Sequence, residues 1–308
     1  MKDALIGATG FVGQNLQKQH HFSLLYNSKN ISEIVGQSLD ILVCAGIPAN
    51  MQIANQNPEK DLEEIQKLME YFTKIKVKNF VLISTIAVYK QPILAVKENS
   101  PMSVYEHQMA YGKNRFGAEQ KVREIFPNAL ILRLPALFGF GLKKNLIYDL
   151  LHPLPTFFKK AAFENLQQAL SSQEKEILNQ YYFFESEKQI FILKNKEKNK
   201  ELLKILEKYQ ATSLAFTHPE SLYQFYHLKN LWKDIQKALQ ANWTDFNLSS
   251  PALSAQKVSE TLTGKNLWNR QAPLYQYDMQ TQHNSTNYTY TQEEVLQELT
   301  EFYNNYAK

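Results

Sequence analysis

The stretch GATGFVG, residues 7–13, decides the expected fold. Its glycines, Gly7, Gly10 and Gly13, follow a short apolar run and precede a segment of helical character. Glycines at this spacing let the backbone turn tightly and approach a pyrophosphate, and the following helix presents free N–H groups to that anion. We therefore expect a phosphate-binding loop between a strand and a helix. The other expected cofactor contacts in this stretch are Thr9, Phe11 and Val12.

The N-terminal part of the chain alternates strand and helix patterns. The apolar runs at 39–46 and 79–85 are typical of strands buried on both faces. Apolar residues at helical spacing over 61–72, and a further helix expected from about 113 to 125, follow these strands in turn. This alternation predicts an α/β fold with a doubly wound parallel sheet, the Rossmann architecture, over residues 1–141.

The composition changes after Gly141. We expect residues 142–308 to form a smaller C-terminal substrate-binding part. Within it, residues 156–212 are rich in Lys, Glu, Gln and Asn, which predicts a helical insertion with at most a short hairpin and a solvated charged face. Late elements that return to the core are expected over about 221–248.

Bulk composition excludes several classes of protein. The chain has 308 residues, 44% of them hydrophobic, and a net charge of +4 without a concentrated basic patch, so nucleic acid is not an expected partner. The single cysteine, Cys44, cannot form an intramolecular disulfide, and its buried run favours packing over nucleophilic chemistry. No apolar run approaches the ~18 residues that span a bilayer, and no Cys/His cluster has metal spacing. We expect a cytoplasmic protein without a metal.

The residues after the second expected strand bear on cofactor choice. YNSKN, residues 26–30, lacks the acidic residue that usually binds the ribose 2′-hydroxyl of NAD. Asn27, Ser28 and Lys29 could instead accept a 2′-phosphate, which favours NADP over NAD. Lys29 is equally compatible with an ordinary surface lysine.

Together these motifs resemble the extended short-chain dehydrogenase/reductase superfamily, in its NAD-dependent epimerase/dehydratase branch. GATGFVG resembles the nucleotide loop, DILVCAG the strand beside the cofactor, and AYGKNRFGAE (110–119) the family's Y-G-x-x-K helix. The resemblance covers the N-terminal two-fifths clearly and the rest loosely. It implies an NAD(P)-dependent oxidoreductase or epimerase/dehydratase acting on a sugar nucleotide or related carbohydrate. It also suggests a homodimer through the helices at 61–72 and 113–125.

The resemblance also assigns roles to single residues. Thr85 would orient the substrate hydroxyl, Tyr111 would be the acid/base, and Arg115 stands where the family has lysine. Further cofactor contacts would come from Cys44, Ala45, Gly46, Tyr111, Arg115, Pro135 and Leu137. Expected substrate contacts are Thr85, Lys143, Lys144, Asn145, Gln224 and Tyr226.

Some of these substrate contacts have equally good structural explanations. The two lysines, Lys143 and Lys144, could form a basic surface loop, and Gln224 with Tyr226 could belong to an aromatic-packed edge strand. His107, just before the tyrosine, is more typical of an exposed loop histidine.

Arg115 decides between two classes of function. A free tyrosine has a pKa near ~10, and a fixed cation beside it favours the phenolate. Arginine supplies a permanent cation, although its planar fork and reach differ from those of lysine. We therefore expect Arg115 to be a working substitute. The alternative is a non-catalytic NAD(P)-binding sensor or scaffold with a degenerate site. Other departures point the same way: no acidic D-L-x-D segment precedes Asp40, and Glu64 stands where asparagine is expected.

Overall fold

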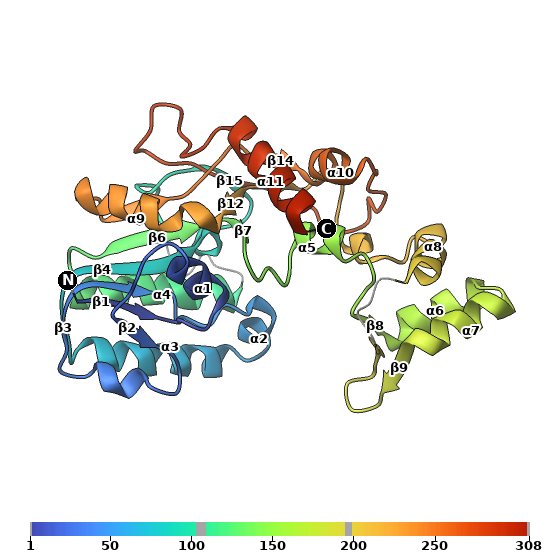
Figure 1. Cartoon of the computed structure of the whole chain (residues 1–308), viewed down its shortest axis with the longest axis horizontal. Coiled ribbons are helices and arrows are strands. Elements are labelled where there is room, and N and C mark those ends of the chain that lie inside the picture. The colour runs from blue at the N-terminus through green and yellow to red at the C-terminus, as the bar shows by residue number, and fades with distance from the viewer. Residues whose placement is uncertain (1, 103–108, 195–198, 307–308) are drawn as a thin grey trace. The chain divides into compact units, whose positions relative to one another are not determined.

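The computed structural model describes residues 2–102, 109–194 and 199–306, which divide between two compact units (Figure 1). Unit 1 comprises Met1–Leu142, Leu222–Leu253 and Gln276–Leu299. Unit 2 comprises Lys143–Ser221, Ser254–Tyr275 and Thr300–Lys308. The chain therefore passes back and forth between the units, and residues 276–299 return to unit 1, a return that the sequence pattern did not indicate.

Unit 1 is built on a parallel sheet of six strands in the order β13-β6-β4-β3-β1-β2. The strands are β1 (Asp3–Ile6), β2 (Leu24–Tyr26), β3 (Ser38–Cys44), β4 (Lys76–Thr85), β6 (Leu130–Leu134) and β13 (Asp245–Asn247). The predicted doubly wound parallel sheet is thus confirmed.

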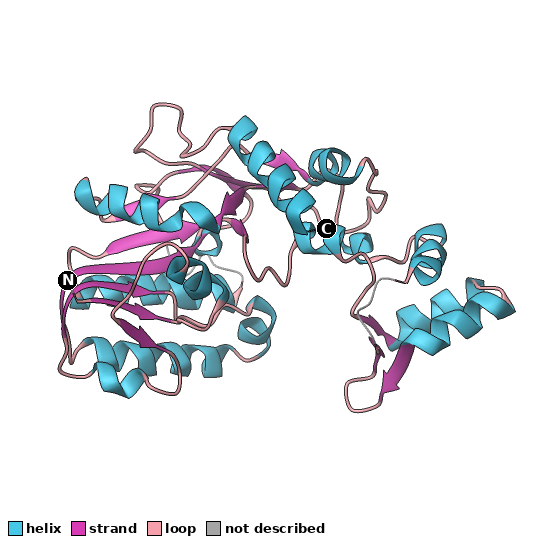
Figure 2. Cartoon of the chain, viewed as in Figure 1, coloured by secondary structure: helices cyan, strands magenta, loops and turns pink. Residues whose placement is uncertain are grey.

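Helices cover both faces of this sheet (Figure 2). Alternate side chains of each strand point to opposite faces: Leu42 packs with the helices α3 and α4, whereas Val43 packs with α1 and α9. The helices of unit 1 are α1 (Phe11–Gln17), α2 (Met51–Gln56), α3 (Pro58–Phe72), α4 (Ala110–Ile125) and α9 (Leu231–Gln240). Burial on both faces explains why the strands are continuous apolar runs in the sequence.

The strand order differs from the commonest dinucleotide-binding sheet at one edge. That sheet has a third strand beyond the second, whereas here β2 is the edge strand. The link from β2 to β3 holds only the 3₁₀ helix η1 (Ile31–Ile34), so β3 returns directly to the other side of β1. This short link is the structural counterpart of the absence of an acidic D-L-x-D segment before Asp40 in the sequence. The order reverses between β1 and β3, and ligands bind at such a point in open α/β sheets.

Smaller elements complete unit 1. Each two-stranded pair joins segments distant in sequence: β5 (Ile93–Val96) with β15 (Tyr277–Met279), β7 (Ala136–Phe138) with β12 (Phe225–His227), and β11 (Leu222–Tyr223) with β14 (Leu253–Ser254). The remaining elements are the 3₁₀ helices η2 (Ile86–Val88) and η5 (Leu228–Asn230), and α11 (Gln292–Tyr306), which continues into unit 2.

Thr291 and Glu294 form the reciprocal capping bonds that their spacing predicts at the start of α11.

Unit 2 has a core of its own around Phe163, Leu178 and Leu202. The inserted segment carries a three-stranded antiparallel sheet rather than a single hairpin: β8 (Phe157–Lys159), β10 (Ile190–Leu193) and β9 (Tyr182–Glu185). The helices of unit 2 are α5 (Leu146–Leu151), α6 (Lys160–Ala169), α7 (Ser172–Tyr181), α8 (Lys200–Lys208), η4 (Ser213–Phe216) and α10 (Ala255–Thr263).

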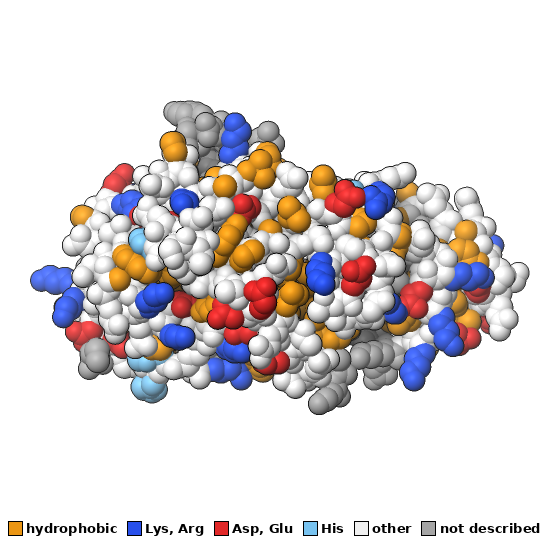
Figure 3. All heavy atoms as spheres, turned by 90° about the horizontal axis from the view of Figure 1, so that it is seen from above, with side chains coloured by type: hydrophobic (Ala, Val, Ile, Leu, Met, Phe, Trp, Pro, Cys, Tyr) orange, Lys and Arg blue, Asp and Glu red, His pale blue; other side chains and the backbone are white. Residues whose placement is uncertain are grey.

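The surface bears charges of both signs. Figure 3 shows Lys and Arg side chains scattered among Asp and Glu on one face of the molecule, without a single basic patch. In the described part of the chain, none of the helices combines the length and the apolar character that a membrane span requires.

A buried ion pair joins α4 to the sheet beside the end of β4. Arg133 of β6 is 1% exposed, and its guanidinium lies 2.6 Å from the carboxylate of Glu119, a fully buried residue of α4. Ser84, the residue before Thr85, donates to the same carboxylate. Arg133 also donates to the Tyr89 hydroxyl at 3.0 Å. These bonds fix α4 against β4 and β6.

Because an uncompensated buried charge is costly, we expect Glu119→Gln to lower the free energy of unfolding by about 3 kcal/mol. Glu124→Gln is the matched control on the same helix: its carboxylate is exposed and pairs with Lys121, so the loss should stay below about 1 kcal/mol. Urea unfolding followed by circular dichroism measures both. Equal losses for the two variants would show that the buried network contributes little.

Candidate active site

The glycine loop is packed too tightly for any other residue at two positions. Gly7, directly after β1, has φ +85°, and a Cβ on it would overlap Ala45 O and lie 2.8 Å from Gly46 N. A Cβ on Gly13, in α1, would overlap the carbonyl of Gly7. The loop is also held by Gly7 N, which donates to Tyr26 O at 2.9 Å. Glycine therefore allows the loop, the start of α1 and the turn after β3 to meet.

This loop lies where the order of the strands reverses. Gly7 and Ala45 follow the carboxyl ends of the adjacent strands β1 and β3. Thr9 and Gly10 are exposed, and Phe11 is half-buried, as is Val12. A backbone cradle with an open face suits a pyrophosphate, which needs close approach to main-chain N–H groups.

Cys44, one of the expected cofactor contacts, is part of the core. Its side chain is fully buried in the core, and burial raises the pKa of its thiol to about 12. The thiol therefore packs against apolar side chains. Any cofactor contact from this turn falls to Ala45 and Gly46, which are partly exposed.

The residues after β2 form a closed turn. Asn27 Oδ1 accepts from Lys29 N at 2.8 Å, and Asn27 N donates to Asn30 Oδ1 at 2.8 Å. The turn leaves Ser28 and Lys29 exposed. A hydroxyl and an ammonium group thus stand free at the end of the edge strand.

Tyr111 and Thr85 come together beyond the end of β4. Thr85 is the last residue of β4, and its hydroxyl accepts from Ala87 N at 3.2 Å. Tyr111 is in the first turn of α4, where its N–H donates to Asn55 Oδ1 at 2.9 Å. The phenol is 9% exposed and lies within hydrogen-bonding reach of the Thr85 side chain. The structure thereby unites two residues that are 26 positions apart in the sequence.

Arg115 also reaches Tyr111, but its charge is already paired. The guanidinium lies 4.1 Å from the centre of the Tyr111 ring. It makes a two-pronged ion pair with Asp61 of α3, one arm of which measures 2.8 Å, and it donates to Pro48 O. Both side chains of the ion pair are nearly inaccessible, with 3% and 5% exposure. Asn114 donates to the same carboxylate at 2.8 Å.

The electrostatic result corrects an expectation about Tyr111. Burial, the largest influence, raises the pKa of the phenol. Arg115 and Thr85 act in the opposite direction, while the Asp61 carboxylate raises the pKa further. Arg115 thus lowers the pKa of Tyr111 as expected, but burial outweighs it, and the net direction in the cofactor-free protein is upward.

Asp61 is the site residue that sequence reasoning missed. A signal was present: Asp61 stands four and seven residues before Ile65 and Leu68, in phase with the buried stripe of α3. Because an acidic side chain is rarely buried without a partner, its presence in a buried stripe predicts a buried cation beside it. Glu64, which stands where asparagine was expected, is exposed.

Two expected substrate contacts, Gln224 and Tyr226, are buried. Gln224 is 1% exposed, and its amide bonds Met279 O at 2.7 Å and Met279 N at 2.8 Å. Tyr226 is 2% exposed and donates to Asp234 at 2.6 Å. Both side chains are committed to buried networks, as in an aromatic-packed strand.

The remaining expected contacts are placed as follows. Pro135 is buried and Leu137 half-buried, next to the carboxyl end of β6 in unit 1. In unit 2, Lys143 and Lys144 are exposed, and Asn145 caps α5 by accepting from Ile147 N at 3.0 Å. His107 lies outside the described residues.

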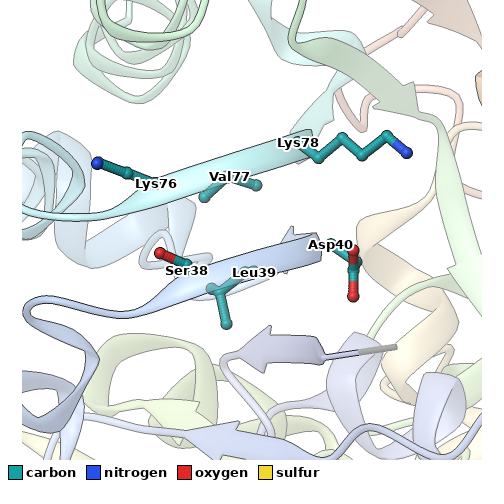
Figure 4. Close-up of a pocket in the computed structure, with 6 residues that line it drawn as sticks. All are labelled: Ser38, Leu39, Asp40, Lys76, Val77 and Lys78. Carbon is teal, nitrogen blue, oxygen red and sulfur yellow. The ribbon is translucent and has the colours of Figure 1, made fainter.

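Figure 4 shows an open hollow lined by residues of β3 and β4, Ser38, Leu39, Asp40, Lys76, Val77 and Lys78. These residues lie at the amino ends of the two strands, opposite to the carboxyl ends that carry the candidate site. The Asp40 carboxylate there accepts from Lys2 N at 2.7 Å. Over the described ranges, no three His, Cys, Asp or Glu side chains are grouped so that they could hold a metal ion.

Comparison with known proteins identifies the fold. No family model and no curated protein sequence matches the chain. Solved structures match over the whole length. A UDP-N-acetylglucosamine 4-epimerase from Bacillus cereus is 14% identical with a TM-score of 0.57, covering 99% of this chain and 98% of that chain. A dTDP-4-dehydrorhamnose reductase from Yersinia enterocolitica is 12% identical with a TM-score of 0.59, covering 99% and 100%. An NAD-dependent NDP-hexosamine 5,6-dehydratase is 13% identical with a TM-score of 0.61, covering 99% and 98%. The chain has the fold of these epimerases, reductases and dehydratases, as the resemblance implied.

We expect alanine to destabilise the protein more at Gly7 than at Gly36, although the two glycines have similar φ angles. Gly7→Ala should lower the free energy of unfolding by about 3 kcal/mol or more, because left-handed strain adds to backbone overlap. Gly36→Ala is the control: its φ is +77°, and nothing lies within 4 Å of the new Cβ, so strain alone should cost about 1 kcal/mol. Urea denaturation of both variants measures the difference. A Gly7→Ala protein as stable as Gly36→Ala would contradict the close approach to Ala45.

Proposed function

We propose that the protein is an NAD(P)-dependent oxidoreductase or epimerase that acts at a hydroxyl or carbonyl carbon of a sugar nucleotide or related carbohydrate. One observation carries this proposal. The Thr85 hydroxyl and the Tyr111 phenol meet beyond the end of β4, at the same edge of the sheet as the glycine loop after β1. A proton-transfer pair beside a dinucleotide cradle is the arrangement that hydride chemistry on an alcohol requires.

The residues present fit a bound dinucleotide. The loop from Gly7 to Gly13 would hold the pyrophosphate on its exposed backbone at Thr9 and Gly10, and Ala45 with Gly46 would lie beside it, because the turn after β3 packs against Gly7. When bound, the nicotinamide accepts or supplies the hydride. Tyr111 gives or takes the hydroxyl proton at its phenolic oxygen, and Thr85 orients the substrate oxygen toward it.

The choice of substrate class rests on the fold and on unit 2. A similar structure, 13% identical with a TM-score of 0.58, contains UDP-glucose and NAD. Lys143 and Lys144, exposed before α5, supply the cations that would bind a diphosphate. The homodimer through α3 and α4 stays a prediction of the same proposal.

A second function is favoured by one observation, the ion pair that occupies Arg115. If its guanidinium is fully committed to Asp61, the chain would keep the cofactor site and lack turnover, as a sensor or scaffold. This alternative predicts dinucleotide binding without any substrate-linked absorbance change at about 340 nm.

Cofactor binding and choice are tested by a fluorescence titration of the purified protein with NADPH and NADH side by side. We expect NADPH to bind at least about tenfold more tightly, because Ser28 and Lys29 are free to contact a 2′-phosphate. Lys29→Gln should remove most of this preference, whereas Lys18→Gln, whose ammonium group lies over the Phe140 ring, should leave it unchanged. Equal affinities would discard the 2′-phosphate argument, and binding of neither nucleotide would overturn the proposed function.

The role of Tyr111 is tested with Tyr111→Phe. This variant keeps the ring but loses the proton-transfer group, so kcat should fall by about 10²–10⁴ while the affinity for the nucleotide stays within about threefold. Turnover would be measured with nucleotide sugars and NAD(P)H or NAD(P)⁺. Tyr89→Phe removes a buried hydroxyl of the Arg133 network and serves as a control for general loss of stability. Full turnover by Tyr111→Phe would refute the mechanism.

A further inference from the structure

We propose that Asp61 is a positioning residue whose buried carboxylate holds Arg115 against the Tyr111 ring and offsets the cationic charge there, so that Tyr111 acts first as a proton donor to a carbonyl group. This inference rests on the proposed function and narrows it toward carbonyl reduction.

The Asp61–Arg115 clamp holds the guanidinium by its two terminal nitrogens, whereas its buried Nε has no hydrogen-bond partner among the described residues. Asp61 takes two of its N–H groups, and Pro48 O takes another. The plane of the Arg115 group lies over the Tyr111 ring at 4.1 Å. Asp61 itself is held by Asn114, whose amide also reaches Pro58 O at 3.1 Å. The clamp thus ties α3, α4 and the segment after β3 around one tyrosine.

The charges that face Tyr111 come from two of the elements packed against it. Among the described residues, Arg115 on its own helix and Asp61 on α3 are the charged groups that act on the phenol. Thr85 from β4 and Asn55 from α2 contribute neutral groups. Arg115 has the larger effect of the two charges, and the Asp61 carboxylate buried against it offsets part of that effect, while burial of the phenol favours its neutral form. The raised pKa of Tyr111 agrees with this balance.

A protonated phenol can donate a proton and cannot accept one, so it suits the first step of carbonyl reduction. In reduction, a hydride passes from the reduced nicotinamide to the carbonyl carbon, and the carbonyl oxygen takes the proton of Tyr111. The carbonyl becomes an alcohol, the cofactor is oxidised, and the phenolate regains its proton from solvent. Oxidation of an alcohol would instead need the phenolate at the start, which the Asp61 carboxylate disfavours.

The test uses nuclear magnetic resonance of the cofactor-free, full-length protein, with tyrosine carrying ¹³C at the ring carbon bonded to the hydroxyl. The Tyr111 resonance is assigned as the signal that Tyr111→Phe removes. Its chemical shift reports whether the phenol is ionised, independently of turnover. In wild type we expect Tyr111 to stay protonated as the pH rises through the ordinary pKa of tyrosine, about 10. In Asp61→Asn we expect the signal to convert to phenolate at a lower pH, because Arg115 keeps its charge and loses its counter-ion.

Glu64→Gln is the matched control, since it removes an exposed carboxylate from the same helix and should leave the Tyr111 titration unchanged. The proposal is overturned if Tyr111 in Asp61→Asn ionises at the same pH as in wild type or at a higher one. Should Asp61→Asn not fold, wild type alone decides: a Tyr111 signal already in the phenolate form at about pH 8 overturns the proposal. Because no cofactor is present, this failure is distinct from failure to bind NADPH or NADH, which would overturn the proposed function instead.

Discussion

The contact on which the site depends is the close approach of the Gly7 loop to the turn after β3. Two adjacent parallel strands end side by side, and their following loops can meet only because Gly7 has no side chain to insert between them. The same loop carries α1, whose Gly13 packs onto the carbonyl of Gly7. The shape of this loop is therefore a property of backbone packing at the point where the strand order reverses.

Thr85 and Tyr111 lie beyond the end of β4, and buried ion pairs hold the elements that carry them. Ser84 and Glu119 fix α4 against β4 just behind Thr85, and Arg133 completes the bond network from β6. From α3, Asp61 holds the Arg115 guanidinium over the Tyr111 ring. Desolvated ion pairs of this kind contribute modestly to net stability but are expensive to break. Here they fix the orientation of the helix that carries Tyr111.

Local patterns in the sequence were enough for much of this architecture. The glycine spacing, the apolar runs at 39–46 and 79–85 and the pairing of Thr85 with Tyr111 follow from short-range signals and from the family resemblance. The Asp61–Arg115 pair joins residues 54 positions apart, so a scan of local motifs shows each residue without its partner. The burial of Gln224 and Tyr226 could not be predicted for a different reason. A strand of alternating aromatic and polar residues has the same pattern whether its polar atoms bind a substrate or, as here, neighbouring backbone and Asp234.

The most direct test of the central claim is a crystal structure of the protein with NADPH bound. We expect the pyrophosphate on the backbone of residues 9–13, the 2′-phosphate near Lys29, and the nicotinamide beside Tyr111 and Thr85. Nucleotide density elsewhere on the molecule, with the glycine loop empty at a saturating concentration, would contradict the assignment of this edge of the sheet as the active site.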